Sequence, residues 1–111
     1  QICHDIRHYF EKHGDARFSD IDGEFEVIIN NRAGYKRRVG DGWHFFVLPE
    51  SFKQDICSGF DQQIAIATLI EKGWLIPDSE GKSTRAEKLP CAESTTRCYR
   101  FDGSKVFSAE I

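Results

Sequence analysis

Residues 61–76 read DQQIAIATLIEKGWLI, and this stretch decides the fold that the sequence predicts. Asp61 is a favourable N-cap for a helix over residues 62–72, because its carboxylate accepts hydrogen bonds from amide groups of the first turn. Gly73 ends the helix, since glycine readily adopts the left-handed conformation of a helix C-terminus. The apolar residues Trp74-Leu75-Ile76 follow at once and predict a strand. We expect this aliphatic helix to lie at the centre of the core.

Further strands are predicted on both sides of this stretch. Tyr35–Val39 and Trp43–Leu48 are separated by Gly40-Asp41-Gly42, whose glycines allow the positive φ of a tight turn, so we expect a hairpin. Glu24–Ile29 alternates between charged and apolar residues and predicts a preceding strand, which would make a three-stranded meander. Cys98–Phe101 predicts the strand that returns to pair with the segment after Gly73.

Two more helices are predicted upstream. Ile2, Ile6 and Phe10 repeat at helical spacing, and a glycine follows at position 14. Pro49 is tolerated in a first helical turn and opens a short helix that ends near Gly59. The link between this helix and the next is short enough to force a steep crossing, as in helix-turn-helix pairs.

The order of these elements predicts an α+β fold of the winged-helix kind. It would contain three helices, an inserted β-hairpin or meander, and a C-terminal β-wing. With 111 residues the chain has room for one domain, which we place at residues 1–102. Residues 103–111 are expected to be a loosely held C-terminal tail, although its residues Val106, Phe107 and Ile111 could dock on the surface of the domain.

Several segments of the sequence also resemble a known family. They are Asn31–Tyr35, Phe46–Lys53, Ile56–Asp61, Leu69–Asp78 and Arg97–Phe101. In these segments the chain resembles the C-terminal region of family 927 of the domains of unknown function, which comprises helicase- or primase-like ATPases common in phages and integrated elements. The shared motifs are structural ones: turn glycines, a helix-opening proline and core aromatics. The resemblance implies an accessory domain beside a replication ATPase domain of the same polypeptide, and it transfers no activity.

The composition favours an excised part of a cytoplasmic protein. The chain begins with Gln1 inside an apolar helical pattern and contains no Met. No apolar run approaches the roughly 18 residues of a membrane span, so no membrane contact is expected. Four cysteines at positions 3, 57, 91 and 98 match no zinc-ligand spacing. Reduced, partly buried thiols are the expected state, with disulfides as the alternative.

The basic residues are concentrated in two places. Residues 31–38 carry four basic and no acidic side chains, although the whole chain has a net charge of −3. In the polar loop of the predicted wing, between Ile76 and Cys98, three more basic residues are candidates. Together they form the candidate nucleic-acid-binding set: Arg32, Lys36, Arg37, Arg38, Lys82, Arg85 and Lys88. Gathered on one surface, these cations would contact phosphates and release counterions.

Alternation along the strand argues against a single basic surface. Arg37 should lie on the same side as Tyr35 and Val39, and Lys36 with Arg38 on the other. A charged edge strand that resists aggregation would explain the same run of residues. Both interpretations stay open at the level of sequence.

Other candidate sites are less favoured. Helix 62–72 occupies the place of a recognition helix. Its polar residues are acidic on balance, which disfavours contact with DNA phosphates. Gln62 and Gln63 are the candidates for hydrogen bonds to base edges. Six aromatic residues could form a platform on which bases stack: Trp43, Phe45, Phe46, Trp74, Tyr99 and Phe101. Because they alternate along strands that lie next to apolar helices, packing in the core is favoured instead.

Catalysis is not expected. His4 and His8 have a spacing that suits zinc on one helix face, yet no third ligand stands at a fitting distance. No nucleophile and base form a recognisable pair. The sequence therefore predicts a non-catalytic chain without metal or cofactor. The function that the sequence favours for this chain is weak, sequence-independent contact with DNA beside the upstream ATPase domain. The alternative is a protein-interaction or oligomer-positioning module with no direct nucleic-acid contact.

Overall fold

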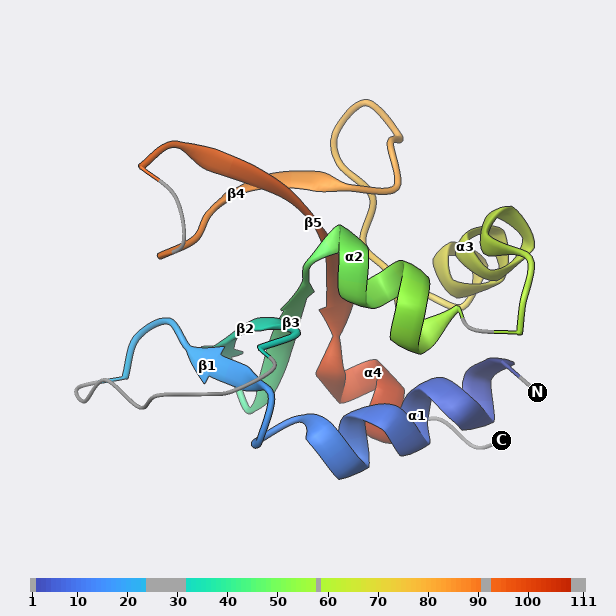
Figure 1. Cartoon of the computed structure of the whole chain (residues 1–111), viewed down its shortest axis with the longest axis horizontal. Coiled ribbons are helices and arrows are strands. Elements are labelled where there is room, and N and C mark those ends of the chain that lie inside the picture. The colour runs from blue at the N-terminus through green and yellow to red at the C-terminus, as the bar shows by residue number, and fades with distance from the viewer. Residues whose placement is uncertain (1, 24–31, 58, 91–92, 109–111) are drawn as a thin grey trace.

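Helices and strands alternate irregularly along the described part of the chain, which comprises residues 2–23, 32–57, 59–90 and 93–108 of a computed structural model (Figure 1). The elements in chain order are α1 (Ile2–His13), β1 (Phe18–Asp20), β2 (Gly34–Val39), β3 (Gly42–Val47), α2 (Pro49–Ser51), the π-helical turn η1 (Phe52–Ile56), α3 (Gln62–Glu71), β4 (Arg85–Lys88), β5 (Thr95–Asp102) and α4 (Gly103–Ser108). The α+β class predicted from the sequence is confirmed.

One mixed sheet contains all five strands, in the order β1-β2-β3-β5-β4. β1 is parallel to β2, and the other neighbours are antiparallel. The hairpin of β2 and β3 is confirmed, and Gly40 in its turn has a φ of 60°. The predicted strand Glu24–Ile29 lies outside the described residues.

Strand β5 joins the β1-β2-β3 part of this sheet to β4. Its C-terminal half pairs with β3 and its N-terminal half with β4, so Figure 1 shows it running from β4 at the top of the view down to α4. The segment after Gly73 also reaches β5: Leu75 forms an isolated bridge with Phe101, and the Ile76 amide donates to the Arg100 carbonyl at 2.9 Å. The predicted pairing of these two segments is confirmed, although only as a single bridge.

The arrangement differs from the expected winged helix. The hairpin stands between α1 and α2 in chain order, as expected, but β2, β3, β4 and β5 belong to one sheet, so the specific winged-helix architecture is not confirmed. Four α-helices are described where three helices were expected. The short strand β1 was missed, since three residues with a polar majority give no period-two signal.

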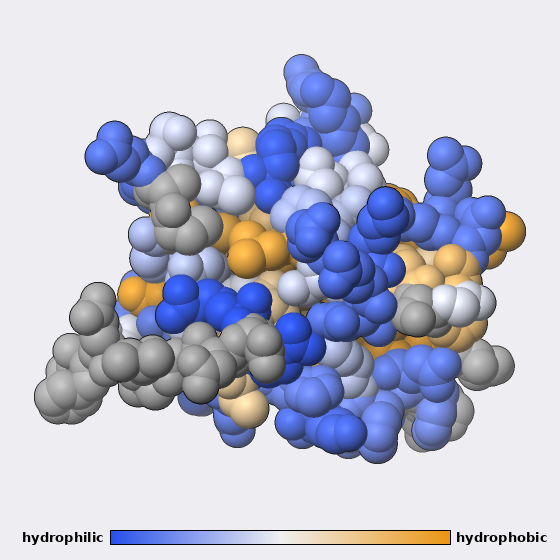
Figure 2. Space-filling view, viewed as in Figure 1, coloured by the Kyte–Doolittle hydropathy of each residue, from blue (hydrophilic) through white to orange (hydrophobic). Residues whose placement is uncertain are grey.

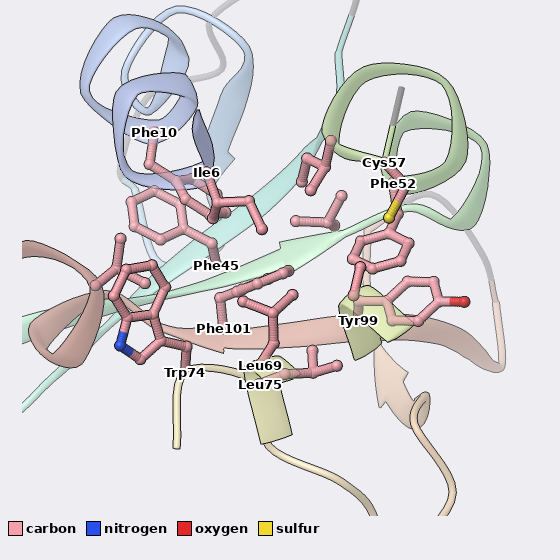
Figure 3. Close-up of a cluster of buried hydrophobic side chains, with 14 of the residues drawn as sticks. Ile6, Phe10, Phe45, Phe52, Cys57, Leu69, Trp74, Leu75, Tyr99 and Phe101 are labelled. Atoms are coloured by element: carbon pink, nitrogen blue, oxygen red, sulfur yellow. The ribbon is translucent and has the colours of Figure 1, made fainter. Parts of the chain in front are cut away.

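The main core lies between the helices and one face of the sheet. In Figure 3, Ile6 and Phe10 of α1 point toward Phe45 and Phe101, and Phe52 lies against Tyr99. The rings of Phe52 and Tyr99 stack with centroids 3.8 Å apart. Burial of so many large apolar side chains is the dominant stabilising term for a chain of this size.

Helix α3 lies at the margin of the core, not at its centre as expected. The predicted cap is confirmed, because the Asp61 carboxylate accepts from the Ile64 amide at 3.1 Å. Ala65 and Leu69 are buried, but Ile64 is 68% exposed. The helix is apolar on nearly all sides, so composition alone gave no indication of which face would be covered.

The C-terminal residues correct a further prediction. Gly103–Ser108, expected to belong to a loosely held tail, form helix α4. The Asp102 carboxylate accepts from the amide of Ser104 at 3.0 Å and caps the first turn. Val106, expected at most to dock on the surface, is fully buried in the main core, and Phe107 is 37% exposed.

Candidate nucleic-acid interface

The second face of the sheet carries a small core of its own. Tyr35, Phe46, Leu89 and Cys98 are buried together, with Ile21 and Leu48 packed against them. These residues come from strands and connecting loops, and no helix in the described part of the chain contributes to the cluster. We call this side of the molecule the helix-free face.

A pocket of about 370 Å³ opens on the helix-free face. Its lining consists of Ile21, Arg37, Phe46, Glu87, Lys88, Leu89 and Pro90. Figure 2 shows this region left of centre as a small apolar hollow bordered by hydrophilic residues. The combination of an apolar floor with a few charged groups is typical of ligand sites.

Part of the predicted basic set lies around this pocket. Arg37 and Lys88 line it directly. Arg32 lies over the ring of Tyr35, 5.1 Å from its centroid, and donates to Ser19 Oγ at 2.9 Å. Arg85 is paired in register with Cys98, which places it on the same side of the sheet.

The rest of the predicted basic set lies elsewhere. Lys36 and Arg38 are on the helix side of β2, where their cationic groups lie 4.9 and 5.7 Å from the Trp43 ring centroid. Alternation along the strand predicted this division, and the structure confirms it. Lys82 lies in the turn after Pro77, 3.5 Å from Glu80, and does not line the pocket.

Carboxylates accompany several of these cations. Arg37 Nε lies 3.1 Å from Asp22, and Lys36 Nζ lies 2.7 Å from Asp15. Arg85 Nε lies 3.1 Å from Glu87. The basic surface is therefore partly neutralised within the molecule. Exposed ion pairs contribute only about 0–1 kcal/mol each, so an incoming anion can replace such a carboxylate at low cost.

A polar network beside the pocket was missed from the sequence. Arg100 donates through its Nη1 to Glu87 at 3.0 Å and through Nε to His44 Nδ1 at 2.9 Å. Its guanidinium also lies 4.9 Å from the ring centroid of Phe46. The available signal was alternation: Arg100 stands between the buried aromatics of β5, so it must face the opposite side.

His44 is neutral in this network. Burial lowers its pKa below the ordinary 6.5, and the nearby Arg100 charge lowers it further, against opposing effects of Asp102 and Glu87. Because Nδ1 accepts a hydrogen bond, the imidazole proton is on Nε2, which lies 3.8 Å from the Asp102 carboxylate. Protonation of Nδ1 would break the hydrogen bond and place two cations in contact.

Acidification is therefore expected to destabilise the fold. In the unfolded chain His44 takes up its proton at higher pH than in the folded chain, so the unfolded state binds more protons below about pH 6.5. The contribution of His44 to stability should be constant above about pH 7.5 and fall as the pH drops through 6.5 toward the lower folded pKa. Urea unfolding at about pH 7.5 and 5.5 measures the difference.

The control for this prediction is His44→Gln, whose side-chain oxygen can still accept from Arg100. This variant should lose less stability on acidification than the wild type. A part of the decrease should persist, because burial and the charge of Arg17 also lower the pKa of His13. An equal decrease in both proteins would contradict a role for His44.

The remaining candidates are structural. Phe45, Phe46, Trp74, Tyr99 and Phe101 are buried, which confirms core packing over a stacking platform. Gln62 donates to the Tyr99 hydroxyl at 3.2 Å, so it is engaged within the molecule. His4 and His8 are exposed, and no group of three metal-ligating side chains occurs among the described residues.

The surroundings of the cysteines among the described residues make their thiols unreactive. Cys3, Cys57 and Cys98 are buried free thiols. Burial raises the pKa of Cys57, and burial together with the nearby Glu87 charge raises the pKa of Cys98 to about 12. Thiolates are the reactive form, so neither side chain suits nucleophilic chemistry.

Comparisons with known proteins add no family. No protein-family model matches the sequence, and no curated protein shows significant similarity to it. Within the described residues, none of the helices is both long and apolar enough to cross a membrane.

Proposed function

We propose that this chain is a binding module that contacts nucleic acid weakly and without sequence preference through its helix-free face. The observation that supports the proposal is the grouping of Arg32, Arg37, Lys88 and Arg100 on a sheet face to which no described helix packs. The family resemblance extends the proposal: the chain is the accessory domain of a mobile-element replication ATPase of the helicase or primase kind, working in the cytoplasm.

Electrostatics explains why such contact is weak. Phosphate contacts dominate sequence-independent binding, and each contributes through the release of condensed counterions. Asp22 and Glu87 already hold three of the guanidinium groups on this face, so phosphates compete with internal carboxylates. We therefore expect few phosphate contacts and a modest salt dependence.

The test is fluorescence anisotropy with labelled single-stranded and duplex DNA at about 50 and 200 mM salt. In the variant Arg37→Gln/Lys88→Gln, affinity at low salt should fall about tenfold. The slope of the log–log salt plot for single strands should decrease by about 0.7 for each lost phosphate contact. The wild type should show a negative slope that corresponds to a few phosphate contacts.

A matched control removes the same charge from the other side of the molecule. Arg38 and Lys53 are both exposed, and neither lines the pocket. The variant Arg38→Gln/Lys53→Gln should bind like the wild type. Equal losses in both variants would show that total charge matters and the helix-free face does not.

A second function is favoured by one observation. Ile64 projects from α3 with 68% of its surface exposed, and Figure 2 shows apolar residues gathered on the right of the view, where α3 lies. This surface suits the upstream ATPase domain as a protein partner. If neither DNA form binds at low salt, a protein-interaction module positioned through α3 replaces the nucleic-acid proposal.

A further inference from the structure

We infer that the pocket on the helix-free face receives the base of one unpaired nucleotide, whose phosphate lies against Arg37 and Lys88. The inference rests on the proposed function and deepens it by naming the form of nucleic acid that binds. It is carried by the pocket's size, its apolar walls and the placement of three charged groups in its lining.

Size and shape of the pocket suit a single nucleotide. A volume of about 370 Å³ is at the small end of ligand sites and is sufficient for one base with its sugar. Ile21 and Pro90 supply accessible apolar surface against which a base can pack, above the almost completely buried Phe46 and Leu89. A base in a duplex is stacked on both sides, so it can enter only from a single strand or after flipping.

The two cations of the lining are suitably placed for a phosphate. Arg37 presents a guanidinium whose side chain is 43% exposed and is held by Asp22 at 3.1 Å. Lys88 lies at the end of β4 and is exposed, and its Nζ donates to the Glu93 carbonyl, so a phosphate would compete with that bond. A nucleotide whose base lies in the pocket, over the strands that separate β2 from β4, brings its phosphate near the two cations.

Glu87 introduces a preference among bases. Its Oε2 accepts from Arg85 at 3.1 Å and from Arg100 at 3.0 Å, and within the described part of the chain neither guanidinium donates to Oε1. A carboxylate oxygen accepts from the amino group of cytosine N4, whereas thymine presents the O4 acceptor at the same position. Among pyrimidines, cytosine should therefore bind more tightly than thymine.

The experiment compares oligomers of cytosine and of thymine in the same anisotropy assay. The wild type should bind a labelled (dC) oligomer about three- to tenfold more tightly than a (dT) oligomer of equal length. Ile21→Trp places a large ring at the pocket and should abolish this preference while keeping the weak, salt-dependent binding. Ile21→Val leaves the pocket open and should keep the preference.

A second measurement reports the pocket directly. Cytidine monophosphate, added to the ¹⁵N-labelled chain, should shift the amide resonances of Phe46, Glu87 and Leu89, and Ile21→Trp should remove these shifts. The same spectra show whether each variant is folded.

The outcomes separate this inference from the proposed function. If the wild type binds both oligomers equally, or if Ile21→Trp keeps the cytosine preference, the pocket inference is overturned and nucleic-acid contact by the cations stands. If no oligomer binds at low salt and cytidine monophosphate shifts no resonance, both are overturned. Resonance shifts with an aromatic peptide in place of the nucleotide would assign the pocket to a protein partner.

Discussion

Replacing Phe101 with alanine is expected to lower the free energy of unfolding by about 3–5 kcal/mol. Phe101 is fully buried in strand β5, where it pairs with Phe45 of β3 and bridges to Leu75. Its ring lies 5.2 Å from that of Phe10 and 6.1 Å from that of Phe52. Truncation leaves a cavity that no neighbour can fill, because strands hold it on both sides.

Urea unfolding followed by tryptophan fluorescence measures this loss, with Phe101→Leu as a graded variant that keeps most of the volume. Ile64→Ala is the matched control, because it removes a large apolar side chain that is exposed on α3. The control should change stability by no more than about 0.5 kcal/mol. A loss below about 1 kcal/mol for Phe101→Ala would contradict the central place of β5 in the core.

Replacing Gly34 with alanine is expected to be the second severe change, with a loss of at least about 2 kcal/mol. A methyl group at this position would lie 1.9 Å from the carbonyl oxygen of Phe46 and 3.2 Å from the ring of Phe18. Neither partner can withdraw easily, because one atom belongs to the backbone of β3 and the other to a buried ring. The hairpin and β1 must separate to admit the methyl group.

The control for this variant is Gly23→Ala. There the added methyl would lie 3.3 Å from its nearest neighbour, the carbonyl oxygen of Asp20, and the backbone φ is not in the left-handed region. Stability should change by less than about 1 kcal/mol. If the two alanine variants unfold at the same urea concentration, the conclusion that β2 and β3 approach closely at Gly34 is wrong.

Local signals in the sequence were sufficient for the individual elements. Asp61 caps α3 as predicted, Gly73 follows it with a φ of 76°, and Pro49 opens the next helix upstream. Each of these features depends on residues within one turn of the chain. The side of β2 on which Arg37 lies was also predictable, since alternation is a local property.

Assembly of the sheet was not predictable in the same way. β5 follows β4 along the chain but also pairs with β3, and that register brings Arg100 beside Phe46 and His44 beside Asp102. The pocket needs Leu89 and Ile21 to meet across the same face. Period-two patterns indicate which residues share a side of one strand, but they do not indicate which strands become neighbours. For this reason the sequence did not predict that the hairpin strands β2 and β3 would share one sheet with β4 and β5.

Strand β5 also determines when the chain can fold during its synthesis. The hairpin leaves the ribosome long before Thr95–Asp102 is translated, so Phe45 and Val47 of the nascent chain have no partner strand on that side. Their apolar side chains stay accessible to chaperones until the last strand emerges. A chain truncated before Thr95 should therefore aggregate and be degraded, even if its helices form.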